Sequence, residues 1–105
     1  MSDYIQIVTT AGTRDDAQRI ARALVDERLA ACVQVVGPVA STYRWKGQIE
    51  SGEEWQCWAK TRQSLYERVE QSIRRLHPYE VPEILALPVL AGSAAYLAWL
   101  DAEVT

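Results

Sequence analysis

One long predicted β-hairpin constrains the fold of this chain more than any other feature. It runs from Leu29 to Thr61, and its two arms meet at the two-residue turn Lys46-Gly47. Each arm has about 15 residues and can reach roughly 50 Å at about 3.3 Å per residue. A compact chain of 105 residues has a radius of gyration of about 13 Å. The hairpin therefore has to bend, project from its own domain or pack on another subunit.

The turn also predicts which side chains of the hairpin share a face. Three cross-strand pairs follow from a two-residue loop: Trp45 with Gln48, Arg44 with Ile49, and Tyr43 with Glu50. Gly37-Pro38 is predicted to interrupt the strand as a bulge because proline lacks an N–H group, and Ser51-Gly52 is predicted to be a second irregularity. A tip that carries Tyr43 and Trp45 would leave large aromatic side chains in water unless something covers them.

Two further strands and three helices are predicted around the hairpin. The two strands cover Tyr4–Thr10 and Ile84–Leu90. The first helix runs from the N-cap Thr13 to about Glu27-Arg28, and the second runs from the capping box Ser64/Glu67 to His77-Pro78. A short third helix follows Gly92-Ser93. This βαββαβ order with an extra C-terminal helix predicts a single α+β domain over residues 1–105, a ferredoxin-like plait with an antiparallel sheet. The first and third strands are then central. An apolar edge strand at Ile84–Leu90 favours burial in an oligomer.

Composition and charge exclude several classes of function. The formal net charge of −3 argues against nucleic-acid binding, which needs a basic face. No apolar run reaches the roughly 18 residues that cross a bilayer. The opening Met1-Ser2-Asp3 has no basic leader region, so a cytoplasmic location is expected. Cys32 and Cys57 have no CxxC spacing and are expected to be buried free thiols.

The single histidine lies in a polar segment that could carry chemistry. His77 is followed by Tyr79, Glu80 and Glu83, and with a nearby cysteine this set could hold copper or zinc. Alternatively, His77 only ends the second helix near the negative end of its dipole. No histidine pair at i and i+4 supports the metal reading.

Glu80 and Glu83 could form an acid/base pair. In an extended segment, however, residues three apart point to opposite sides, so surface or interface salt bridges to Lys60 or Arg62 are the alternative. No hydrolase elbow, dinucleotide motif or phosphate-binding loop is present. The tryptophans, three of which lie on the hairpin, either line a ligand cleft or pack at an interface. These residues alone name no reaction.

Five spaced motifs stand in order along the chain: Leu29–Val33, Ser41–Gly47, Lys60-Thr61, His77–Ile84 and Tyr96–Leu100. Through these motifs the chain resembles the CutA family of divalent-cation tolerance proteins over almost its whole length. The resemblance implies a cytoplasmic, ferredoxin-like homotrimer in which the long hairpins and sheet edges pack between subunits. It also implies tolerance of copper and other divalent cations.

The resemblance associates copper binding with the histidine before the proline, here His77. Leu76 and Thr9 stand where relatives often carry a second histidine and a cysteine, which leaves one candidate ligand. We therefore expect a non-enzymatic trimer that takes part in the response to metal ions and binds copper(II), or another divalent cation, weakly at His77. No membrane or nucleic-acid partner is expected.

The alternative is a signalling module similar to the trimeric nitrogen-regulatory proteins, which bind small ligands between subunits. The residues expected to line such a cleft are Cys32, Tyr43, Trp45, Lys60, Tyr79, Glu80, Glu83 and Trp99. An enzyme that uses Glu80 and Glu83 is a third hypothesis, and it requires that both carboxylates converge on one pocket.

Overall fold

Residues 3–105 are described by a computed structural model, and they form one antiparallel sheet with helices on one side and at one end. The elements in chain order are β1 (Tyr4–Ala11), α1 (Arg14–Asp26), β2 (Cys32–Trp45), β3 (Gln48–Arg62), a short 3-10 helix (Gln63–Leu65), α2 (Tyr66–Leu76), β4 (Ile84–Pro88) and α3 (Ala94–Glu103). Met1 and Ser2, on which the prediction of no leader partly rests, lie outside the described residues.

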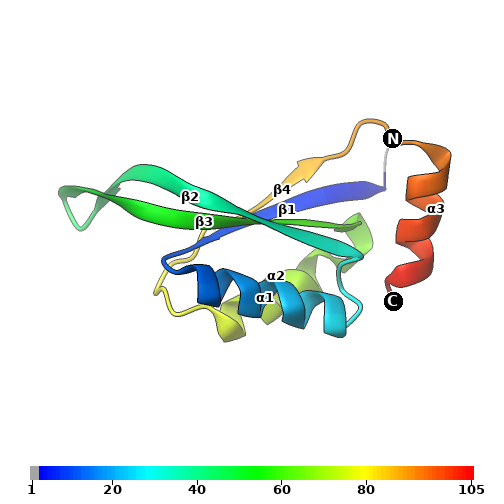
Figure 1. Ribbon diagram of the computed structural model, residues 1–105, viewed down its shortest axis with the longest axis horizontal. Coiled ribbons are helices and arrows are strands. Elements are labelled where there is room, and N and C mark those ends of the chain that lie inside the picture. Colours follow the sequence, from blue (N-terminus) through cyan, green and yellow to red (C-terminus); the bar gives the residue numbers. More distant parts are fainter. Residues whose placement is uncertain (1–2) are drawn as a thin grey trace.

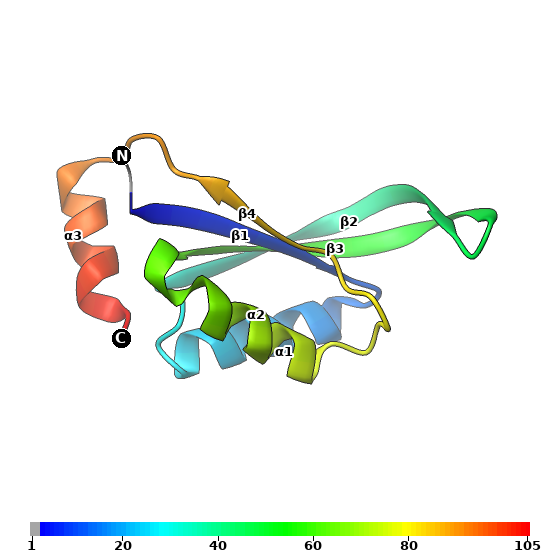
Figure 2. The same cartoon turned by 180° about the vertical axis from the view of Figure 1, so that it is seen from behind.

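The strand order of the sheet is β2-β3-β1-β4, so β1 and β3 are central, as predicted. Both α1 and α2 lie against the same face, and α3 lies at the end of the sheet near both termini (Figures 1 and 2). The other face carries no helix over its middle. The molecule measures 45 × 25 × 22 Å, and the tip of the β2-β3 hairpin extends well beyond the helices (Figure 1). Of the three predicted alternatives for the hairpin, projection from its own domain is the one seen in this chain (Figure 1).

Alternation along the central strands produces the core. Ile5 and Ile7 of β1 point toward the helices and are buried against Ile20, Leu24 and Ile73. The predicted N-cap of α1 is confirmed, since the Thr13 hydroxyl accepts a hydrogen bond from the Asp16 N–H at 3.1 Å. Within residues 3–105, no helix is long and apolar enough to cross a membrane.

The hairpin has the predicted turn and register. Lys46 and Gly47 both have positive φ angles, 50° and 81°, as a type I′ turn requires. The three predicted cross-strand pairs next to the turn are present. The predicted irregularity at Ser51-Gly52 is wrong, because these residues pair continuously with Thr42 and Ser41. Nothing lies within 4 Å of a Cβ atom added at Gly52, so no close contact requires a glycine or a bulge here.

The bulge at Gly37-Pro38 is confirmed. Val36 pairs with Gln56 and Val39 with Glu54, so two residues of β2 oppose the single residue Trp55. A Cβ atom on Gly37 would lie 2.7 Å from Cδ1 of Trp55, so only glycine fits beside this indole. Since Gln56 and Glu54 share a face, Val36 and Val39 share it too.

Two predicted boundaries are wrong. Ser64 and Glu67 do not form a capping box, because the chain first makes a 3-10 turn that buries Leu65, and α2 starts at Tyr66 without a side-chain cap. Strand β4 ends at Pro88 rather than Leu90, since Pro88 already lies opposite Ile5 near the start of β1. Leu90 is 94% exposed.

Candidate functional site

A cavity of about 700 Å³ lies between the outer half of the hairpin and the segment that joins α2 to β4. It gathers five of the eight predicted cleft residues, namely Tyr43, Trp45, Tyr79, Glu80 and Glu83. The hairpin supplies the first two and the α2-β4 segment supplies the other three. Two segments far apart in the sequence therefore form one candidate site.

The prediction that Glu80 and Glu83 point to opposite sides is wrong, because both line this cavity. The reason is that the segment bends over residues 79–81 instead of running extended. The predicted salt bridges to Lys60 and Arg62 do not form within the chain. Lys60 instead donates to Gln34 at 2.6 Å, and Arg62 pairs with Asp101 at 3.7 Å.

Tyr79 joins the two walls of the cavity. Its hydroxyl donates a hydrogen bond to Oε2 of Glu54 on β3 at 2.9 Å. Partial burial, followed by the neighbouring Glu54 carboxylate, raises the pKa of Tyr79 to about 12. The phenol therefore stays protonated and holds the loop to the hairpin. Gly12 leaves room for the ring, since a Cβ atom there would lie 2.9 Å from the Tyr79 hydroxyl oxygen.

Glu54 was not among the predicted site residues, although it also lines the cavity. The signal that could have found it was the register of the turn. Residues 48, 50, 52 and 54 alternate onto the face that carries Tyr43 and Trp45. Continuing the predicted pairs by two more steps would have placed Glu54 beside them.

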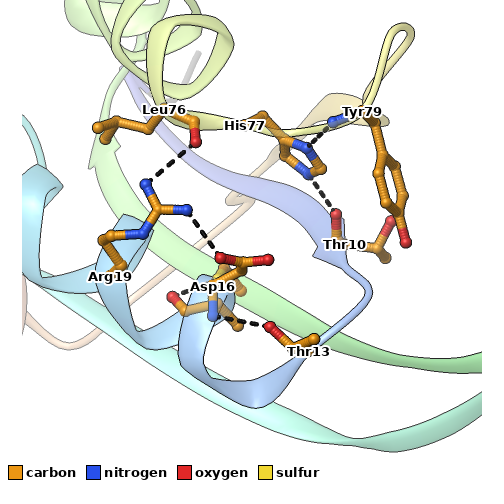
Figure 3. A network of polar contacts seen from close by, with 9 residues as sticks. Thr10, Thr13, Asp16, Arg19, Leu76, His77 and Tyr79 are labelled. Carbon is orange, nitrogen blue, oxygen red and sulfur yellow. Dashed lines mark hydrogen bonds and ion pairs between the residues drawn. The ribbon is translucent and has the colours of Figure 1, made fainter.

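His77 is the C-cap of α2 and is 8% exposed. Figure 3 shows that both of its ring nitrogens are engaged. Nε2 lies 2.6 Å from the carbonyl oxygen of Thr10, and Nδ1 accepts the N–H of Tyr79 at 3.1 Å. Since a carbonyl only accepts, Nε2 must carry the proton and Nδ1 must supply its lone pair to Tyr79. The imidazole thus connects β1 to the loop that lines the cavity.

A second set of contacts fixes the same end of α2. Arg19 of α1 donates to the carbonyl oxygen of Leu76 at 3.2 Å and to Asp16 at 2.7 Å (Figure 3). The Arg19 guanidinium, together with the Thr13 hydroxyl, lowers the pKa of the Asp16 carboxyl. This network satisfies a helix-end carbonyl and holds His77 in place.

The remaining three predicted cleft residues lie at the other end of the sheet. Cys32 pairs with Lys60 across β2 and β3, and Trp99 lies on α3, where its ring is 5.5 Å from that of Tyr96. Along β2, about 11 residues separate Cys32 from Tyr43, a distance of roughly 35 Å. Within one chain, the predicted cleft is therefore two separate clusters, which only a second subunit could bring together.

The cysteines do not complete a metal site. Cys57 is fully buried, its thiol donates to the carbonyl oxygen of Ala17, and burial raises its pKa to about 11. Cys32 is half-buried and free. Residues 3–105 contain no group of three or more His, Cys, Asp and Glu side chains placed to hold a metal ion.

Comparison with known proteins gives one consistent family. The family model described as CutA1 divalent ion tolerance protein matches residues 5–103. The chain is 42% identical over 94 residues to the divalent-cation tolerance protein CutA of Thermus thermophilus, covering 90% of this chain and 91% of that protein. It is 46% identical over 84 residues to human Protein CutA, covering 80% of this chain and 47% of that longer protein.

Solved structures agree with the sequence match. The crystal structure of CutA from Xylella fastidiosa superposes with a TM-score of 0.95 at 39% identity, covering 99% of this chain and 100% of that one. The CutA1 structure from Thermus thermophilus gives a TM-score of 0.94 at 38% identity, covering 97% and 99%. The chain therefore belongs to the CutA1 family of divalent ion tolerance proteins.

Proposed function

We propose that this protein works in the response to divalent cations as a non-enzymatic, cytoplasmic homotrimer with a ferredoxin-like plait, and that it binds copper(II) only weakly. The observation that carries the proposal is the state of His77. Its protonated Nε2 and its occupied Nδ1 leave no free lone pair for a metal ion. Copper would have to displace the Tyr79 N–H or the Thr10 carbonyl, and this cost lowers the affinity.

The trimer is supported by the face of the sheet that α1 and α2 leave uncovered. Leu85 and Leu87 lie on this face of β4 and are 56% and 46% exposed. Tyr96 and Trp99 on α3 are 42% and 43% exposed. Large exposed apolar side chains are typical of protein interfaces. A neighbouring subunit on the open face would cover Leu85 and Leu87.

The absence of enzymatic activity is supported by the cavity lining. Among the described residues that line it there is no histidine, lysine or cysteine, the side chains most often used for proton transfer or nucleophilic attack near neutral pH. Glu80 and Glu83 converge there, but the aromatic rings beside them are suited to binding. We therefore favour a binding site over a catalytic one.

Calorimetric titration with copper(II) tests the metal part of the proposal. The intact protein is compared with His77→Ala and with His77→Gln, whose amide can replace both hydrogen bonds without an imidazole. We expect a dissociation constant weaker than about 1 μM for the intact protein, and weaker binding still in both variants. Identical isotherms in all three would remove His77 from the copper site.

Mass in solution tests the assembly. Sedimentation equilibrium at micromolar concentration should give three times the chain mass of 11.8 kDa. A stable monomer under these conditions would contradict the trimer without affecting the copper titration, so the two parts of the proposal fail independently.

A second candidate function is favoured by the cavity itself. A volume of about 700 Å³ is within the range of small-molecule sites. Ligand binding between the hairpin and the α2-β4 segment would make the protein a signalling module, in which occupancy of the cavity changes the position of the hairpin. Ligand-dependent stabilisation, measured by thermal unfolding, distinguishes this function from a response to metal alone.

A further inference from the structure

The cavity beside the hairpin carries negative charge from both of its walls. Glu54, Glu80 and Glu83 all line it, while Arg44 is the single basic residue among its described lining residues. The formal balance is therefore three carboxylates against one guanidinium. A site with this charge attracts cations and repels anions, most strongly at low ionic strength.

Its aromatic lining points to an organic cation. Tyr43, Trp45 and Tyr79 come from both walls and are 49%, 38% and 39% exposed in the single chain, so each ring has surface left for a further contact. Indole and phenol rings attract ammonium groups through the negative potential of their faces. The ammonium of the next residue, Lys46, lies 5.5 Å from the centre of the Trp45 ring.

The Tyr79 hydroxyl is arranged to accept rather than to donate toward the cavity. The Tyr79 hydroxyl uses its proton on Glu54 at 2.9 Å, so its oxygen offers lone pairs to the cavity. With a pKa near 12 this phenol remains neutral at physiological pH. The carboxylates, the Tyr79 oxygen and the aromatic faces favour a cation, and the hydroxyls of Thr10, Ser41 and Thr42 can donate or accept beside them.

We propose that this cavity binds a small organic cation, an ammonium group carried on an apolar body. The inference rests on the ligand-binding function proposed above and specifies the ligand class. Carboxylates neutralise the ammonium charge, and the aromatic rings cover its alkyl groups. A hydrated inorganic cation would leave those rings unused, and no cluster of three or more metal-ligating side chains occurs in residues 3–105.

Choline and 3,3-dimethyl-1-butanol provide a matched pair of probes, since they have the same shape and differ in charge. Binding is measured calorimetrically on the intact protein in low-salt buffer at pH 7. We expect choline to bind at least about tenfold more tightly than the neutral alcohol. Equal affinity would overturn the cation proposal while the ligand-binding function stands. Binding of neither compound would overturn both.

Two variants locate the site. Glu83→Gln should weaken choline about fivefold and leave the neutral alcohol unchanged, because only the charge interaction is removed. Glu53→Gln is the matched control, since Glu53 is also exposed but lies on the other face of β3 and does not line the cavity. An equal effect of both substitutions would mean a general charge effect and would overturn the assignment to this cavity.

Trp45→Leu separates aromatic recognition from burial. It should weaken choline about three- to tenfold with little change for the neutral alcohol. The mass of this variant is measured in the same buffer. If it remains assembled and binds choline normally, the aromatic part of the proposal is wrong. If it dissociates, the Glu83→Gln comparison decides.

Discussion

The helix-covered body and the projecting hairpin arm differ in how much of their side-chain surface the chain itself buries. In the body, Ile7, Ile20 and Ile73 are fully buried between the sheet and two helices of the same chain. In the arm, which we define as residues 39–53, every residue from Thr42 onward is exposed. An isolated two-stranded hairpin is marginally stable in water. The difference teaches that chain-internal burial stabilises the body and leaves the arm with little burial of its own, which the proposed trimer would supply.

The largest expected effect is a loss of folding stability from a substitution in the body, compared with a substitution in the arm. Ile73→Ala removes a fully buried side chain and should lower the free energy of unfolding by about 2–5 kcal/mol. Ile49→Ala, at a side chain that is 69% exposed, should change it by less than about 0.5 kcal/mol in a dissociated chain. Urea unfolding at matched protein concentration gives both values. Equal losses would mean that the two regions share one core.

The next effect is a loss of assembly from a substitution in the arm that leaves the fold of the body unchanged. Trp45→Asp places a charge at the hairpin tip. If the proposed trimer packs there, the variant should dissociate at a concentration at least about thirtyfold higher than the intact protein does, as for a tryptophan hot spot. Far-ultraviolet circular dichroism of the subunit should remain unchanged. Trp45→Phe is the control that keeps an aromatic ring. Unchanged dissociation of the Asp variant, measured by sedimentation equilibrium, would count against the tip as an interface.

A smaller effect is expected at the junction between the two regions. Gly37→Ala brings a methyl group to 2.7 Å from the Trp55 ring and should cost about 1–3 kcal/mol of stability through overpacking. Gly52→Ala is the matched control in the regular part of β3, where nothing lies within 4 Å of the added atom. It should change stability by no more than about 0.5 kcal/mol. A neutral Gly37→Ala result would show that the indole has room to move.

The smallest effect is a pH dependence carried by Tyr79, which links body and arm. Its folded-state pKa of about 12 lies above the ordinary value of 10.0. The protonated phenol therefore stabilises the folded state below pH 10, and this contribution is lost as pH rises toward 12. Ultraviolet titration of tyrosinate should show the late-titrating group, and Tyr79→Phe should remove it. If the variant keeps the late step, another tyrosine is responsible.

The sequence predicted the regular parts of the fold from local rules. The Lys46-Gly47 pair predicted the turn, and the turn predicted the pairing of Trp45 with Gln48. His77-Pro78, which cannot continue a helix, predicted the end of α2. Each of these depends on neighbours in sequence. The start of α2 did not follow, because burial of Leu65 in the tertiary structure overrode the local capping signal at Ser64.

The candidate site was predicted in part. Five predicted residues meet in one cavity, but Lys60, Cys32 and Trp99 lie at the far end, since a list of polar and aromatic residues contains no information on distance along β2. The convergence of Glu80 and Glu83 was missed because their spacing was read as extended strand. A bend made by tertiary contacts, including the His77 ring on Thr10, decides their direction.

The bulge at Gly37-Pro38 has a consequence for the direction of the arm. Its two residues oppose only Trp55, while the pairing on each side continues without a break. Removing Pro38 would thus leave the inner pairs, the turn and the choice of face for every side chain as they are. What would change is the extra bend and twist that a bulge introduces. Pro38 thus sets the direction of the arm, and its deletion would keep a complete hairpin that points elsewhere.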